Sequence, residues 1–83
     1  MQLVMCSIRD IVVGAFNRPY FLVSRGQAIR SFQDEVMRSS EDNPMYKHPA
    51  DYELYELGKF DDQSGGFEVY AQPELIARGS DVQ

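Results

Sequence analysis

The chain has little of the residue types that build catalytic, metal and disulfide sites. Its 83 residues include one cysteine, one histidine and no tryptophan. With Cys6 alone no internal disulfide can form, which fits a reducing compartment. Cys6 and His48 together supply only two nitrogen or sulfur ligands, short of the usual zinc site. We therefore expect no enzyme, no metal and no cofactor, with Cys6 buried in a strand and His48 in a surface loop.

Long apolar runs and basic clusters are also absent from the sequence. The apolar stretch from Leu3 to Ile8 is too short to span a bilayer and has no cationic lead-in. The formal net charge is −5, and the sequence pI is about 4.6. These features predict a soluble intracellular protein without a membrane partner, and the acidic charge weighs against nucleic-acid binding.

The charges are unevenly distributed along the chain. Residues 1–38 carry five arginines against three carboxylates, a net +2, whereas residues 39–83 carry three basic side chains against ten carboxylates, a net −7. Such asymmetry can place a cationic face on an acidic protein, or it can mark two solvated surfaces without functional meaning.

Apolar periodicity and turn residues predict one α+β domain over residues 1–83, with residues 79–83 as a frayed tail. We expect strands at residues 2–8 and 20–23, joined by an apolar crossing segment over residues 10–16. Ser24 and Gln27 fit a capping box that opens a helix over about residues 25–38. Its apolar face is formed by Ala28, Ile29, Phe32 and Val36, and Arg30, Asp34 and Arg38 form a charged ladder opposite.

The second half of the chain predicts a β-hairpin. Residues 51–60 and 67–71 form its strands, and the Asp61–Gly66 segment is a turn with two glycines free to adopt positive φ. Pro73 then fits the first position of a short helix, PELIAR, that Gly79 ends. The predicted fold is a small antiparallel or mixed four-stranded sheet with one main helix, in the order ββαββ plus a short C-terminal helix.

Arginines and tyrosines are the candidate binding residues. A four-stranded sheet with one helix leaves a second face open, where tyrosines could stack on bases and arginines could contact phosphates. The candidates for this role are Arg9, Arg18, Arg25, Arg30, Tyr20, Tyr52 and Tyr55, with Tyr70 as a further platform residue. A half-bare sheet could equally be covered by a second copy of the chain.

Three ordered motifs resemble the small non-structural protein of microviruses, the tailless icosahedral phages with circular single-stranded DNA, and of their gokushovirus branch in particular. The motifs are SIRD at residues 7–10, AIRSF at residues 28–32 and KHPADYELYELGKFDD at residues 47–62. The resemblance covers residues 5–72, and its most specific unit contains Lys47, His48, Pro49, Tyr52, Gly58, Phe60, Asp61 and Asp62.

The resemblance implies a protein of the host bacterial cytoplasm that is absent from the virion and acts in genome replication or packaging. It attaches no catalytic residues to the motif. Two hypotheses follow. The first is a single-stranded DNA binder. The second is a homodimeric protein-interaction module that regulates the phage replication initiator or the procapsid, with viral replication or capsid-assembly proteins as partners.

Overall fold

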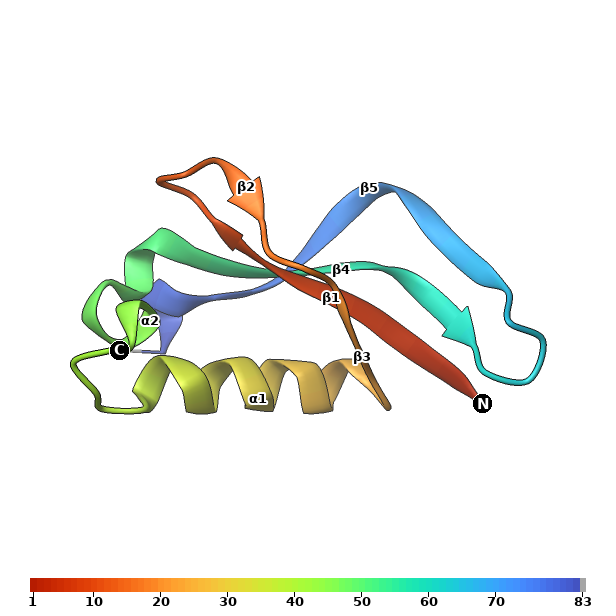
Figure 1. Ribbon diagram of the computed structural model, residues 1–83, viewed down its shortest axis with the longest axis horizontal. Coiled ribbons are helices and arrows are strands. Elements are labelled where there is room, and N and C mark those ends of the chain that lie inside the picture. Colours follow the sequence, from red (N-terminus) through yellow and green to blue (C-terminus); the bar gives the residue numbers. More distant parts are fainter. Residues whose placement is uncertain (83) are drawn as a thin grey trace.

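The computed structural model describes residues 1–82, which form a curled antiparallel sheet with one main helix along one face (Figure 1). The α+β class is therefore confirmed. The elements in chain order are β1 (Gln2–Asp10), β2 (Ala15–Phe16), β3 (Tyr20–Leu22), α1 (Arg25–Met37), α2 (Pro44–Lys47), the 3-10 turn η1 (Pro49–Asp51), β4 (Tyr52–Asp61), β5 (Phe67–Arg78) and the 3-10 turn η2 (Gly79–Asp81).

The sheet order is β2-β1-β4-β5, and β3 pairs with β1 as well. β4 pairs along the whole of β1, so β2 and β3 share the opposite edge of β1: β2 pairs at residues 9–10 and β3 at residues 4–6. All pairs are antiparallel. The strand arrangement thus has one short strand more than the predicted ββαββ order.

The predicted crossing segment over residues 10–16 is a tight hairpin instead. The Asp10 carboxylate accepts hydrogen bonds from the backbone N–H groups of Val12 and Val13, at 3.1 and 3.2 Å, and Gly14 turns the chain with φ +79°. The aspartate and the glycine together close the reversal, so that β2 returns directly beside β1.

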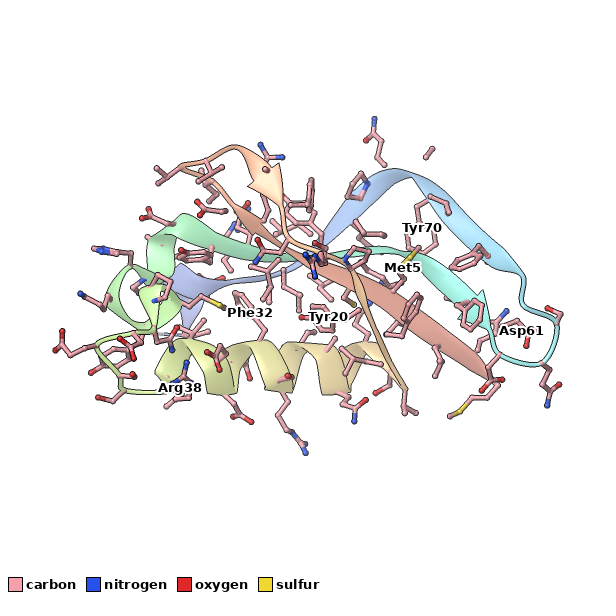
Figure 2. All side chains as sticks on the ribbon, viewed as in Figure 1. Met5, Tyr20, Phe32, Arg38, Asp61 and Tyr70 are labelled. Atoms are coloured by element: carbon pink, nitrogen blue, oxygen red, sulfur yellow. The ribbon has the colours of Figure 1, made fainter. Side chains whose placement is uncertain are left out.

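The helix prediction is confirmed almost to its ends. The Ser24 hydroxyl accepts a hydrogen bond from the backbone N–H of Gln27. The Gln27 side chain accepts from the backbone N–H of Val23, and not from that of the cap residue Ser24 as in a capping box. Cys6, predicted to be buried, is fully buried. The core consists of Val4, Cys6, Ala28, Phe32, Val36, Met45 and Leu54. Figure 2 shows Phe32 and Tyr20 between α1 and the sheet.

The β4–β5 hairpin confirms the predicted turn, with the Asp61 carboxylate accepting from the N–H of Gln63 and Gly65 at φ +75°. Gly58 is required by close packing, because a Cβ there would lie 2.0 Å from the carbonyl oxygen of Glu68 on β5.

The predicted C-terminal helix is wrong: residues 73–78 continue β5. Leu75 pairs with Tyr55 and Ala77 with Leu54. A six-residue helix gains little on its own, whereas the same residues in the sheet bring Ile76 and Ala77 against the core. Pro73 is tolerated because it lies where β5 departs from β4, between the pairs Glu56↔Glu74 and Gly58↔Val69.

In the segment expected to fray, η2 follows β5 directly, Gly79 is buried and Val82 packs against the core. Residue 83 lies outside the described residues.

Candidate functional site

The face of the sheet that points away from α1, called the open face below, carries half of the chain's aromatic rings. On β1 the side chains of Val4, Cys6 and Ile8 belong to the core. Because strand residues alternate between faces, Leu3, Met5, Ser7 and Arg9 lie on the open face. Their cross-strand partners share that face, in four rows: Leu3, Phe60 and Phe67; Met5, Phe21, Gly58 and Val69; Ser7, Tyr55 and Leu75; Arg9, Phe16, Glu53 and Arg78.

The first two rows form an apolar surface, called the distal patch, of Leu3, Met5, Phe21, Phe60, Phe67 and Val69. Phe60 lies 4.8 Å from Phe67 and 5.4 Å from Phe21 between ring centroids, with tilted ring planes. Phe21 and Phe67 remain 44% and 60% exposed although they touch other rings. The distal patch contains no charged side chain, so it can receive flat or apolar groups but cannot neutralise a phosphate.

The last two rows, called the proximal patch, combine rings with charge. Phe16 meets Tyr55 edge to face with 5.2 Å between centroids, and the Arg9 guanidinium carbon lies 5.3 Å from the Phe16 centroid. That distance is within the range of a cation–π contact. The Tyr55 hydroxyl donates to Glu53, which also pairs with Arg78 at 3.4 Å. The proximal patch therefore offers Arg9 as a cation held beside an aromatic ring.

The structure brings only part of the predicted site together. Arg9 and Tyr55 lie on the open face, and Arg18 is exposed in the link between β2 and β3 at the sheet edge. Tyr20 and Tyr52 pack against the core on the α1 side. Burial raises the pKa of Tyr20 to about 12. Arg30 is exposed on α1. A binding role for these residues stays a prediction.

Arg25, another predicted binding residue, belongs to a network that sequence reasoning missed. Its Nε donates to Glu56 at 2.9 Å and its Nη2 to Glu74 at 2.6 Å. Glu56 is 2% exposed and also accepts from the Tyr70 hydroxyl at 2.5 Å. The network ties the first turn of α1 to β4 and β5, so these side chains stabilise the fold.

The pKa shifts in this network follow from burial and hydrogen bonding. Burial by itself would raise the pKa of Glu56, but the hydrogen bonds from Arg25 and Tyr70 outweigh it and leave the pKa lowered. The hydrogen bond to Glu56 raises the pKa of Tyr70 to about 12. Burial, followed by the nearby charge of Glu56, raises the pKa of Cys6 to about 11, so the thiol stays protonated at neutral pH.

The residues of the KHP…FDD motif serve the fold in several places. Pro49 begins η1. Its carbonyl oxygen lies so close to Gly79 that a Cβ added there would be 2.0 Å away, so the packing of η1 requires glycine at position 79. His48 is exposed and caps α2 through its backbone. Asp62 pairs with the N-terminal amine of Met1 at 2.8 Å. The Lys47 Nζ lies 3.9 Å from the Glu41 Oε2.

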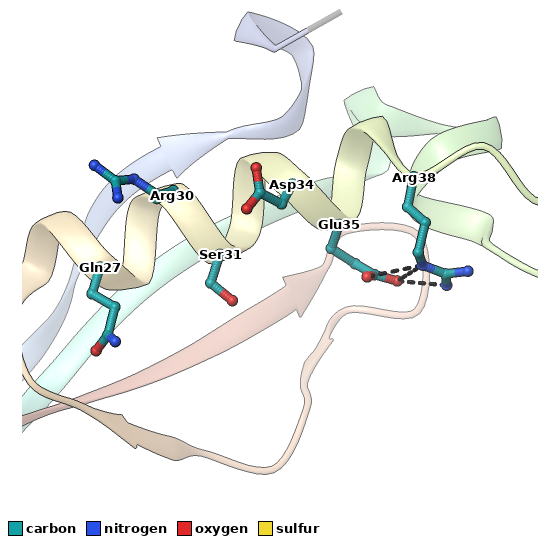
Figure 3. Close-up of a pocket in the computed structure, with 6 residues that line it drawn as sticks. All are labelled: Gln27, Arg30, Ser31, Asp34, Glu35 and Arg38. Atoms are coloured by element: carbon teal, nitrogen blue, oxygen red, sulfur yellow. Dashed lines mark hydrogen bonds and ion pairs between the residues drawn. The ribbon is translucent and has the colours of Figure 1, made fainter.

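The outer face of α1 offers a second, polar surface, a depression lined by Gln27, Arg30, Ser31, Asp34, Glu35 and Arg38 (Figure 3). The predicted ladder of Arg30, Asp34 and Arg38 is replaced by a pair in which Arg38 donates to Glu35 at 2.7 Å. This surface is an open, solvated helix face. Across residues 1–82, no cluster of three or more His, Cys, Asp or Glu side chains is placed to hold a metal ion.

Phe16, Phe21, Phe60 and Phe67 are the open-face rings that sequence reasoning left out of the candidate binding residues, although Phe60 belongs to the KHP…FDD motif. Phe21 could have been found from strand alternation, because it follows Tyr20 directly and a strand that buries Tyr20 must turn Phe21 to the other face. The remaining rings depend on strand pairings that the sequence does not reveal.

Comparison with known proteins gives one match. A family model described as "Phage ORF5 protein" matches residues 3–82. No curated protein and no solved structure matches the chain. Within the part of the chain that the structure describes, no helix has the length and apolar character needed to cross a membrane.

Proposed function

Because that match spans nearly the whole chain, the protein belongs to the phage ORF5 protein family, and we propose that it binds single-stranded DNA on the open face of its sheet. The proposal places it in the replication or packaging of a single-stranded phage genome of the microvirus type, in the cytoplasm of the host. The observation that carries the proposal is the row of exposed rings on the open face, with Arg9 at one end.

Stacking is the larger part of the proposed interaction. Base–aromatic stacking contributes about 1–3 kcal/mol per base and needs no particular sequence. Phe21 and Phe67 offer exposed ring surface in the distal patch, and Phe16 offers it in the proximal patch. Duplex DNA keeps its bases inside the helix, so this mode of binding favours single strands.

Phosphate contacts are the smaller part. Arg9 and Arg18 make no ion pair with any carboxylate of residues 1–82. Arg9 lies on the open face, and Arg18 is exposed in the link between β2 and β3. Two such contacts on a single strand give a slope of about −1.4 for the logarithm of affinity against the logarithm of salt concentration. A net charge of −5 keeps the electrostatic contribution small.

Fluorescence anisotropy with a labelled oligonucleotide at about 50 mM salt tests the proposal. Binding of a single strand, and weaker binding of the matching duplex, are expected. Phe67→Ala should weaken binding about 5- to 150-fold, the equivalent of one lost stacking contact. Met37→Ala is the matched control, because Met37 is as exposed as Phe67, 61% against 60%, but lies at the end of α1.

The arginines provide a second matched pair. Arg9→Ala and Arg30→Ala change the net charge equally, but Arg9 lies on the open face and Arg30 on α1. We expect Arg9→Ala to weaken binding more and to flatten the salt slope. Absence of binding by the unaltered protein, or equal losses for Phe67→Ala and Met37→Ala, would refute the proposal.

A homodimeric protein-interaction module is the second candidate, and the charge-free distal patch is the observation that favours it. A fully covered aromatic side chain buries roughly 150–250 Å². With Phe21 at 44%, Phe67 at 60% and Val69 at 69% exposure, the patch offers roughly 300 Å² per chain. Standard interfaces bury about 800 Å² per partner. The distal patch alone therefore supports weak self-association, which sedimentation over a range of concentrations would detect and which Phe67→Ala would abolish.

A further inference from the structure

The hairpin between β1 and β2 ends in an exposed apolar tip of Ile11, Val12 and Val13. Val12 and Val13 are 74% and 73% exposed, and Ile11 is 44% exposed. Isolated apolar residues on a surface are ordinary, but three in succession at the end of a projecting hairpin are not. Figure 1 shows the hairpin rising from the sheet on the side away from α1, which is the side of the open face.

The backbone of the tip is held firmly. Its turn is closed by the Asp10 carboxylate, which accepts from the N–H groups of Val12 and Val13, and by the 2.8 Å hydrogen bond from the Gly14 N–H to the Asp10 carbonyl. The Ile11 N–H donates to the Asp51 carbonyl at 2.9 Å, which anchors the hairpin to η1. The valines are thus presented to solvent by a fixed turn, and they do not fold back onto the core.

The tip continues from the proximal patch. Arg9 and Phe16 form the pair of the β1–β2 ladder farther from the turn, and Asp10 and Ala15 form the pair next to it. A strand whose bases stack beside Phe16 and whose phosphate meets Arg9 would therefore lie next to the turn that carries the tip. Apolar side chains that enter between adjacent bases are a known way in which proteins unstack DNA.

We propose that Val12 and Val13 form a wedge that enters between adjacent bases of the bound single strand and ends their stacking at the proximal patch. The inference rests on the proposed single-strand binding. A protein partner fits the tip less well, because valine is seldom a dominant residue in protein interfaces.

A single strand that contains the fluorescent base 2-aminopurine among adenines tests the wedge. The emission of this base is quenched by stacking and rises when a neighbour is separated from it. Anisotropy of an end label on the same oligonucleotide reports binding independently. For the unaltered protein, both signals should rise together to saturation.

The informative variant is Val12→Ser with Val13→Ser, and the matched control is Val23→Ser, since Val23 is also an exposed valine, at 53%, but precedes α1. At saturating protein, the double variant should still raise the anisotropy and should lose the rise in 2-aminopurine emission. The control should keep both signals. Circular dichroism confirms that all three proteins are folded, which is expected because the altered side chains are exposed.

The outcomes separate the two proposals. An anisotropy rise without a 2-aminopurine rise in the unaltered protein overturns the wedge and leaves single-strand binding intact. Equal 2-aminopurine emission for the double variant and the unaltered protein does the same. The absence of any anisotropy change overturns single-strand binding and the wedge with it.

Discussion

Replacing Glu56 with glutamine should destabilise the fold far more than replacing Glu74, although both carboxylates bind the same guanidinium. Arg25 donates to Glu56 at 2.9 Å and to Glu74 at 2.6 Å. The difference lies in burial, because Glu56 is 2% exposed and Glu74 is 51% exposed. Glutamine keeps the volume of glutamate but removes its charge and replaces one of the two acceptor oxygens of Glu56 with an NH2 donor. The comparison with Glu74 therefore tests the buried, charge-assisted hydrogen bonds.

The magnitudes follow from the two environments. Hydrogen bonds to a buried charged group contribute about 1.5–3 kcal/mol, so Glu56→Gln should lower the free energy of unfolding by about that amount. An exposed pair contributes about 0–1 kcal/mol, which sets the limit for Glu74→Gln. A domain of 83 residues has a total stability of roughly 4–12 kcal/mol. Glu56→Gln should therefore lower the melting temperature by about 6–24 °C.

The pH dependence supplies an independent check. The pKa of Glu56 is lowered in the folded protein from its ordinary value of 4.5. A lowered pKa means that the carboxylate stabilises the fold above the unfolded-state pKa, and that this contribution is lost as pH falls through the folded pKa. The stability gap between the unaltered protein and Glu56→Gln should therefore be full at pH 7 and should shrink below about pH 4.5. Glu35 and Asp61, which also have lowered pKa values, are present in both proteins and cancel in the difference.

Urea unfolding followed by circular dichroism, at several pH values, measures both effects. Equal losses for the Glu56 and Glu74 variants at pH 7 would contradict the burial argument. A gap that widens as pH falls would show that the direction of the Glu56 pKa shift is wrong.

Two further pairs of substitutions test the packing. Gly58→Ala should destabilise the hairpin by about 2 kcal/mol or more, because the new Cβ would lie 2.0 Å from the Glu68 carbonyl oxygen. In contrast, the Cβ of Gly26→Ala in α1 would meet only the Ser24 side chain, at 3.9 Å. That substitution should stabilise the protein by up to about 1 kcal/mol. Phe32→Ala should cost about 3–5 kcal/mol, since Phe32 is 1% exposed. Urea unfolding measures both pairs, with Met37→Ala as the exposed control for Phe32, and a cost at Met37 equal to that at Phe32 would contradict the packing described above.

The helix and the β4–β5 hairpin could be predicted because their signals are local. The Ser24 cap and the spacing of Ala28, Phe32 and Val36 lie within one segment, and the Asp61–Gly66 turn contains its own hydrogen-bond acceptors and glycines. Each of these elements is favoured by its own residues before any tertiary contact forms. The C-terminal segment from Pro73 has no such strong local signal, and pairing with β4 decided its conformation.

The composition of the open face could not be predicted, because a β-bulge changes which residues share a face. Strict alternation from Leu54 would place Phe60 on the α1 side of β4. In the structure, Leu57 is the extra residue between the pairs Cys6↔Glu56 and Met5↔Gly58. The bulge moves Phe60 to the same face as Tyr55. The distal patch therefore depends on one unpaired residue whose position only the full sheet determines.

The charge asymmetry of the sequence also changes meaning once the pairings are known. Of the five arginines in residues 1–38, Arg25 is held by Glu56 and Glu74 of the acidic half, and Arg38 by Glu35. Arg30 lies on α1, so of these five only Arg9 lies on the open face, and Arg18 is exposed at the sheet edge. Arg78 of β5 shares the open face but is paired with Glu53. A face with so few cations available to phosphates and several exposed rings must derive its affinity for a single strand mainly from stacking. Removing the Phe67 ring should consequently weaken binding at 200 mM salt about as much as at 50 mM, whereas removing the charge of Arg9 should matter less as salt rises. If the Phe67→Ala effect instead disappeared with salt, as expected for a phosphate contact, the open face would not be a stacking surface.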